Sequence, residues 1–175
     1  MFDSHYPITH QHHQVNQENP SITTYYRYFE CGLGNRYMIL VDKYPEGFFV
    51  IQFCLRKYRK EPDRYLKTAN ADFANVKVIS TCFYVLRMFL NEYPNASFAF
   101  QGIYDTKEEQ KEICRNHIKS QRFRIYEYMV VSRISENIFN HSVYDKENAY
   151  LLINKRDKRE DVVQIMEERF ISLLR

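Results

Sequence analysis

One short segment of the chain has the side chains that nucleic-acid binding requires. Between residues 56 and 67 it carries six basic residues and an interleaved tyrosine: Arg56, Lys57, Tyr58, Arg59, Lys60, Arg64 and Lys67. Cationic side chains neutralise phosphates and release counterions, and a tyrosine can stack on a base. The alternative is a solvated loop whose lysines protect the end of a strand. The net charge of only +3 favours this alternative.

A second pair of cations stands on a predicted helix. Arg122 and Arg124 are two positions apart, which turns their side chains about 200° away from each other on a helix. Both could bind an anion, or one could pair with an acidic residue of the fold while the other faces solvent. The wide angle favours the ion-pairing role. The neighbouring Tyr126 fits a packing role.

Histidines gather near the start of the chain, at His5, His10, His12 and His13. Neutral imidazoles bind transition-metal ions, so the cluster His10-Gln11-His12-His13 could hold one. A metal site also needs ligands that are held rigidly by further contacts. Residues 1–22 carry few apolar anchors and are typical of a flexible tail. The sequence therefore predicts a polar tail and no metal site.

The remaining nucleophiles and bases form no catalytic set. Cys114 and His117 lie one helical turn apart but lack a third group that would orient the imidazole, and His141 adjoins a predicted turn. The four cysteines are widely spaced and fit buried free thiols better than disulfides or a zinc site: Cys31, Cys54, Cys82 and Cys114. We therefore expect no catalytic residue, no metal and no cofactor.

The elements that must position these residues follow from the hydrophobic spacing. Apolar and aromatic runs predict strands at residues 25–32, 37–44, 47–57, 97–103 and 149–154. Apolar residues three or four apart predict helices that begin near Asn70, Thr106, Ser120 and Asp157. Turn residues between the first three strands predict an antiparallel meander. The expected organisation is a tail over residues 1–22 and a single mixed α/β or α+β domain over residues 23–175.

Three meandering strands followed by αβαβα is the element order of the ribonuclease H-like fold, and the similarity concerns the fold only. Enzymes with that fold hold two divalent metals on acidic residues of the first strand, the first helix, the fourth strand and the last helix. Glu30 and Asp105 suit the two strand positions, which makes a metal-dependent nuclease the alternative function. The first helix has acids only at its ends, Asp72 and Glu92, which disfavours it.

Three short motifs follow the first predicted helix: Tyr93-Pro94-Asn95-Ala96 at the helix exit, Gly102 at a strand end, and Arg122-x-Arg124-Ile125-Tyr126 on a helix. Together they resemble a family of small bacterial proteins of unknown function, over roughly residues 71–155. The chain departs from that family by a longer strand-to-helix link over residues 106–119. It also has Tyr104 where the family has a small hydroxyl residue. The resemblance implies a bacterial cytosolic protein and supplies no activity.

The composition bounds the function classes. The 175 residues are enough for one self-sufficient core, and the four glycines exclude long Gly-rich phosphate loops. No apolar run is long enough to span a bilayer, and residues 1–20 lack a signal-peptide pattern, so we expect a cytoplasmic protein. Its 15 Tyr and 13 Phe predict a non-catalytic binding or regulatory subunit. The expected partner is a protein, a second copy of the chain or a nucleic acid, in a setting such as bacterial defence.

Overall fold

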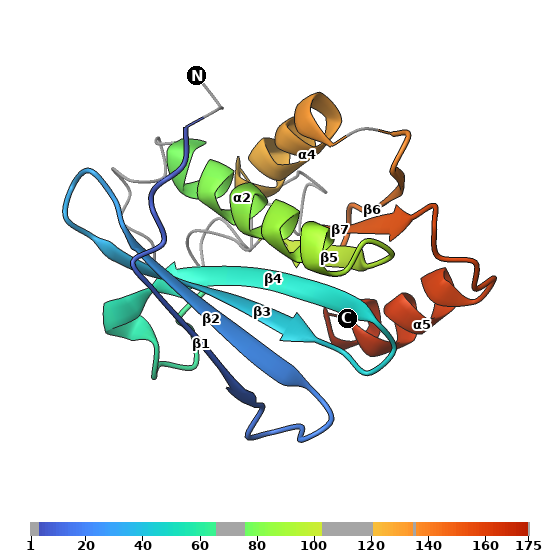
Figure 1. Cartoon of the computed structure of the whole chain (residues 1–175), viewed down its shortest axis with the longest axis horizontal. Helices are drawn as coiled ribbons and strands as arrows, with labels where there is room; N and C mark the ends of the chain where they lie inside the picture. Colours follow the sequence, from blue (N-terminus) through green and yellow to red (C-terminus); the bar gives the residue numbers. More distant parts are fainter. Residues whose placement is uncertain (1–3, 66–75, 103–120, 135, 175) are drawn as a thin grey trace.

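The computed structural model describes residues 4–65, 76–102, 121–134 and 136–174, and it shows one α+β domain (Figure 1). Seven strands form one sheet: β1 (His10–Val15), β2 (Thr23–Glu30), β3 (Arg36–Lys43), β4 (Phe48–Leu55), β5 (Ser97–Gln101), β6 (Phe139–Tyr144) and β7 (Ala149–Asn154). The described helices are α2 (Val76–Glu92), α4 (Gln121–Arg133) and α5 (Val162–Arg169), with 3-10 turns η1 (Arg56–Tyr58) and η2 (Ile171–Leu174). The predicted single mixed α+β domain is confirmed.

The strands lie in the order β1-β2-β3-β4-β5-β7-β6. Successive strands from β1 to β4 are antiparallel, β4 and β5 are parallel, and β7 runs antiparallel to both β5 and β6. A parallel pair needs a crossover connection, and α2 lies in it. Gly34 (φ +78°) and Gly47 (φ +84°) allow the tight turns on either side of β3, because glycine adopts the left-handed conformation without strain.

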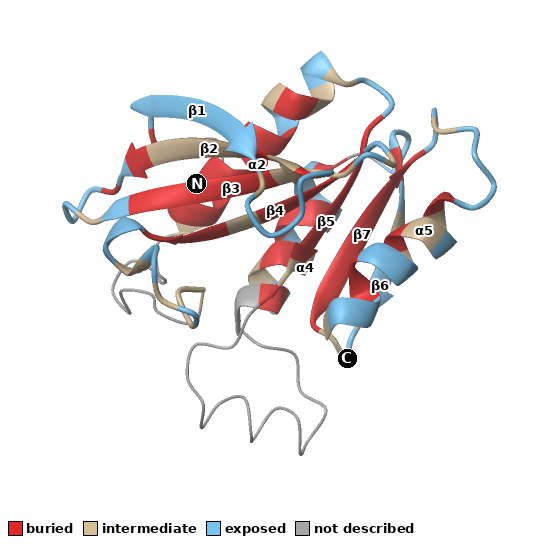
Figure 2. Ribbon diagram, turned by 90° about the horizontal axis from the view of Figure 1, so that it is seen from below, coloured by how far each residue is buried: buried red, intermediate tan, exposed pale blue. Residues whose placement is uncertain are grey.

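Helices cover the two faces of the sheet to different extents (Figures 1 and 2). On the first face lie α2 and α4, where Phe83 and Tyr126 pack on Phe100 with ring centroids 5.9 and 5.0 Å apart. On the second face, α5 and η2 cover buried residues of β4, β5 and β7. None of the described helices covers the part of the second face that β1 and β2 form. We call this part the open face and define it by four side chains: His10, His12, Tyr26 and Tyr28.

The first strand lies inside the segment that the sequence predicts to be a tail. β1 pairs with β2 over six residues, although all of its residues are exposed. Tyr6 anchors this segment: its side chain is only 7% exposed, and its backbone N–H donates a hydrogen bond to Thr81 Oγ1 at 3.0 Å. One buried tyrosine and a row of backbone hydrogen bonds thus connect this segment to the sheet, and the predicted division at residue 22 stays a prediction. The mobility of this segment in solution stays a prediction.

β6 is the other strand that the sequence does not predict, since Asn140, His141 and Ser142 interrupt its apolar residues. With β1 and β6, the described element order has two more strands than the ribonuclease H-like order, and that finer similarity is not confirmed. The last helix begins at Val162 and not near Asp157. The helix starts expected near Asn70, Thr106 and Ser120 lie outside the described residues.

The turn between α2 and β5 contains Tyr93-Pro94-Asn95-Ala96 and is fixed by a neighbouring strand. The Asn154 side-chain amide donates hydrogen bonds to the carbonyl oxygens of Pro94 and Ala96 at 2.9 and 3.0 Å. Gly102 follows β5, and a Cβ at this position would overlap the backbone and Cβ of Phe123 in α4. These two motifs therefore set how closely α2 and α4 approach the sheet.

Candidate nucleic-acid interface

The open face carries a row of four aromatic rings from two neighbouring strands. Alternate residues of a strand point to the same face, and the register pairs His10 with Tyr28 and His12 with Tyr26. The His12 ring stacks on Tyr26 with ring centroids 4.6 Å apart and planes at 12°, and on Tyr28 at 5.6 Å and 19°. Gln14 Nε2 donates a hydrogen bond to the Tyr26 hydroxyl at 2.9 Å. The rings contact one another, so a further planar group would extend the row from one of its ends.

The predicted basic segment follows directly after β4 and reaches this row. Arg56 has its guanidinium carbon 5.2 Å from the centroid of the Tyr28 ring, within the range of a cation–π contact. The chain then turns through η1, where the backbone N–H of Arg59 donates to the carbonyl oxygen of Arg56 at 3.3 Å. This turn leaves Arg56, Lys57, Arg59 and Lys60 exposed. The structure therefore joins the basic segment to the aromatic row.

Next to this contact is a shallow basic depression of about 440 Å³. Its lining contains four cations and no acidic residue: Gly34, Asn35, Arg36, Leu55, Arg56, Lys57 and Arg59. A second depression of about 280 Å³ shares Arg36 and Arg56 with it and extends to Tyr28 and Glu30. The Arg36–Glu30 ion pair, 3.1 Å from Nε to Oε2, is exposed and so contributes little to stability. A phosphate could displace this carboxylate at small free-energy cost.

Burial raises the pKa values of three polar groups beneath the open face: Cys54, Tyr65 and Asp42. Burial raises the pKa of the Cys54 thiol to about 11, so the thiol stays protonated. Burial likewise raises the pKa of Tyr65 to about 12, although Arg64 donates a hydrogen bond to its hydroxyl at 3.0 Å. Asp42 is buried as well, which raises its pKa, and Thr24 Oγ1 donates a hydrogen bond to it at 2.5 Å. Cys54 and Tyr65 therefore stay protonated at neutral pH.

The other predicted site residues do not join this surface. Arg124 is exposed on α4, which covers the opposite face of the sheet, and Tyr126 is buried as predicted for a packing role. Glu30 stands exposed at the end of β2 and pairs with Arg36. Several predicted residues lie outside the described residues: Lys67, Asp105, Cys114, His117 and the side chain of Arg122. In the described part of the chain, no group of three or more His, Cys, Asp and Glu residues could hold a metal ion.

Sequence reasoning missed the contribution of His10, His12, Tyr26 and Tyr28. The signal was present in the alternation of β2, where Tyr26 and Tyr28 face opposite to Tyr25 and Phe29. The partner strand gave no such signal because every residue of β1 except Val15 is polar. Only the register between the two strands brings the imidazoles beside the phenol rings.

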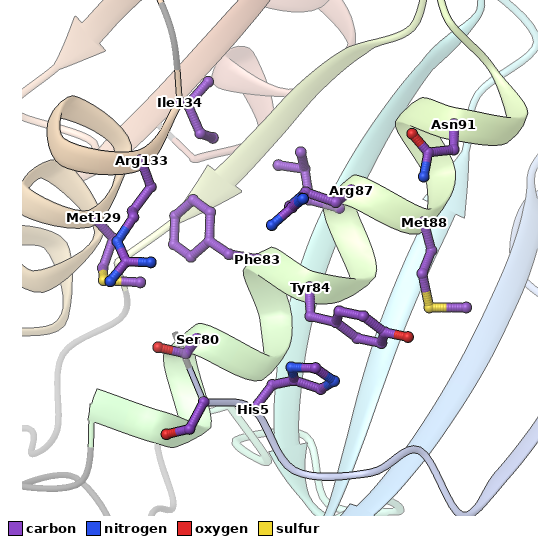
Figure 3. Close-up of a pocket in the computed structure, with 12 residues that line it drawn as sticks. His5, Ser80, Phe83, Tyr84, Arg87, Met88, Asn91, Met129, Arg133 and Ile134 are labelled. Carbon is purple, nitrogen blue, oxygen red and sulfur yellow. The ribbon is translucent and has the colours of Figure 1, made fainter. Parts of the chain in front are cut away.

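A further concave site is a groove on the other face of the molecule (Figure 3). It measures about 380 Å³ and lies between α2 and α4. Phe83 projects from α2 towards Met129 and Arg133 of α4, and the His5 ring stacks on Tyr84 with ring centroids 3.7 Å apart. The groove and the open face lie on opposite sides of the sheet, so one short ligand cannot contact both.

Comparisons of the chain with family models, with curated proteins and with solved structures give no match. Among the described helices, none is long and apolar enough to cross a membrane.

Proposed function

We propose that this protein is a non-catalytic binding subunit that binds single-stranded nucleic acid through the open face and the basic segment 56–64. The observation that carries the proposal is the depression lined by four cations and no acid, placed directly beside a row of exposed and half-buried rings. Phosphate contacts supply most of the affinity for single strands, and aromatic rings add stacking that tolerates any base.

Local charge supports a polyanionic ligand. Residues 56–64 contain five basic residues against Glu61 and Asp63, an excess as large as the +3 of the whole chain. Most of these cations are exposed, so phosphates can reach them. Arg36 of β3 lines the same depression as Arg56, Lys57 and Arg59, so it adds a sixth cation to the surface.

The shape of the surface favours a single strand over a duplex. Its rings stand on a sheet, and the described residues offer no helix on this face that could enter a major groove. Unpaired bases can instead extend an existing row of rings, because every base has a π face. The Cys54 thiol is buried and in no disulfide, which favours a reducing compartment, so we propose a cytoplasmic location.

The test is the salt dependence of binding to labelled single-stranded DNA and RNA oligonucleotides, measured by fluorescence anisotropy. For the natural chain we expect log K to fall with log salt by about 0.7 for each phosphate contacted. A fourfold variant with Arg56, Lys57, Arg59 and Lys60 changed to Gln should bind weakly and with a flatter slope. The matched control removes four exposed cations elsewhere: Arg87, Arg124, Arg133 and Lys146, each changed to Gln.

Equal losses in the two fourfold variants would show that only net charge matters and would contradict the proposed interface. Absence of binding to any oligonucleotide would leave a protein partner or a second copy of the chain as the ligand.

The alternative function, a ribonuclease H-like nuclease, is tested in the same samples. Cleavage that needs Mg²⁺ and disappears in both Glu30→Gln and Asp105→Asn would overturn the non-catalytic function.

A further inference from the structure

We propose that His10 and His12 form a two-imidazole chelate site for a divalent transition-metal ion, with Cu²⁺, Ni²⁺ and Zn²⁺ as the class of ligand. The two histidines belong to the open face, but the metal site does not require that this face binds nucleic acid. Imidazole nitrogen is a ligand that these ions favour, and Cu²⁺ binds such sites most tightly among the first-row divalent ions. Three features support this site: the spacing of the two rings, their contacts with β2 and the different position of His13.

The spacing of the two rings suits one shared ion. His10 and His12 are two positions apart on β1 and so point to the same face of the strand. Their ring centroids are 5.6 Å apart, with planes at 42°. An imidazole nitrogen binds Zn²⁺ at about 2 Å, which puts each ring centre about 3 Å from the ion and two tetrahedrally arranged rings about 5 Å apart. Both side chains are exposed, so a small rotation converges them without moving the core.

The strand pairing supplies the rigidity that a tail would lack. The register holds His10 opposite Tyr28 and His12 opposite Tyr26. The backbone N–H of Thr9 donates to the carbonyl oxygen of Tyr28 at 2.8 Å, which fixes the chain just before the first ligand. The His12 ring also stacks between the rings of Tyr26 and Tyr28. The objection that the sequence raised against a metal site, namely flexible ligands, therefore does not apply to these two side chains.

His13 provides an internal contrast. It lies on the opposite face of β1, where its ring is 5.4 Å from that of Tyr25. It therefore cannot share an ion with His10 and His12 while the strand stays paired.

With two protein ligands, water or a solute fills the remaining positions of the ion. The site is accordingly an exchangeable one and not a structural zinc site, which uses four protein ligands.

The experiment titrates the full chain, without any histidine tag, with CuCl₂ and NiCl₂ by isothermal titration calorimetry. We expect one ion per chain on this site. His10→Gln and His12→Gln should each weaken binding about tenfold or more, since even the loss of an outer-shell partner has an effect of that size. His13→Gln should leave the affinity unchanged. Circular dichroism of the metal-free variants checks that each one keeps the fold.

A second measurement does not depend on any variant. The electron paramagnetic resonance spectrum of the natural chain with one equivalent of Cu²⁺ should show hyperfine coupling to two imidazole nitrogens. His12→Gln should remove one of the two, whereas His13→Gln should not change the spectrum. Equal weakening by all three substitutions would overturn the proposal, because it would mean that the histidines bind as a flexible cluster. Coupling to three or more nitrogens, or unchanged affinity in His10→Gln and His12→Gln, would overturn it too.

Discussion

The second face of the sheet is built differently at its two ends. Under α5 it is apolar: Phe48, Val50, Ala99 and Leu151 are at most 3% exposed and pack in one cluster with Met166. At the other end, on β1 and β2, the same face carries imidazole and phenol rings that are exposed or half-buried. One sheet surface thus changes from a core into a solvent-facing aromatic row within a few strands.

The difference separates stability from binding. Burying apolar area stabilises a fold by roughly 25 cal/mol per Å², so the covered end holds the domain together. The open end gains little from burial. Natural edge strands usually carry charged side chains or proline that discourage further contacts, and β1 has neither. We infer that the covered end determines stability and the open end determines ligand binding.

The largest effect is expected at the covered end. Met166→Ala removes a fully buried side chain and should lower the free energy of unfolding by about 2–5 kcal/mol, because it leaves a cavity between α5 and the sheet. Urea denaturation followed by circular dichroism measures this. Leu173→Ala, at a side chain that is 75% exposed, is the control and should change stability by about 0.5 kcal/mol or less. A small effect of Met166→Ala would mean that α5 does not seal this face.

At the open end the expected effect is on affinity. Tyr28→Ala should weaken oligonucleotide binding by about 1–3 kcal/mol, since it removes a stacking ring and the contact of Arg56. Its unfolding free energy should fall by less than that of Met166→Ala. Tyr128→Ala removes a tyrosine that is 56% exposed on α4 and should leave binding unchanged. Fluorescence anisotropy measures the oligonucleotide affinity of the natural chain and of the two variants. Equal losses of affinity in both tyrosine variants would contradict a binding role specific to the open end.

Between the two ends, Asp42 gives a smaller effect that depends on pH. Burial raises its pKa above the ordinary 3.8, so the folded state favours the protonated carboxyl. Its contribution to stability is complete below pH 3.8 and is lost as pH rises through the raised pKa. Asp42→Asn removes this dependence. The variant should gain stability relative to the natural chain as pH rises from 3 to 7, in urea denaturations at each pH. A constant difference would show that Asp42 ionises normally.

The smallest effect concerns β1 itself. An exposed edge strand opens locally at a free energy far below that of global unfolding. Hydrogen-exchange mass spectrometry should therefore show faster exchange in a peptide of residues 7–15 than in one that covers β3, whose residues Tyr37–Val41 are buried. Exchange in residues 7–15 as slow as in β3 would contradict both this expectation and the predicted mobility of the segment.

Much of the architecture could be predicted from the sequence because it depends on apolar spacing. β2, β3, β4, β5 and β7 overlap the predicted strands, and the apolar rows of α2 lie on the sheet. β1 could not be predicted, since a strand made of His and Gln has no alternation and forms through hydrogen bonds to its neighbour. β6 could not be predicted either, since polar residues interrupt its apolar ones and it forms through hydrogen bonds to β7.

The candidate site could be predicted only in part. The cations from Arg56 to Arg64 are adjacent in the sequence and therefore visible there. Their neighbours are not: Arg36 comes from β3, and Tyr28 meets Arg56 only because the strands pair in one register. The interface depends on long-range pairing, and no local pattern contains that information.

The most direct test of the central claim is where nucleic acid touches the chain. Single-stranded RNA that contains 4-thiouridine can be crosslinked to the full chain with ultraviolet light, and mass spectrometry then identifies the modified peptides. We predict crosslinks on Tyr26, Tyr28 and residues 56–64. Crosslinks concentrated on the α2–α4 groove, for example on Tyr84, would contradict the account.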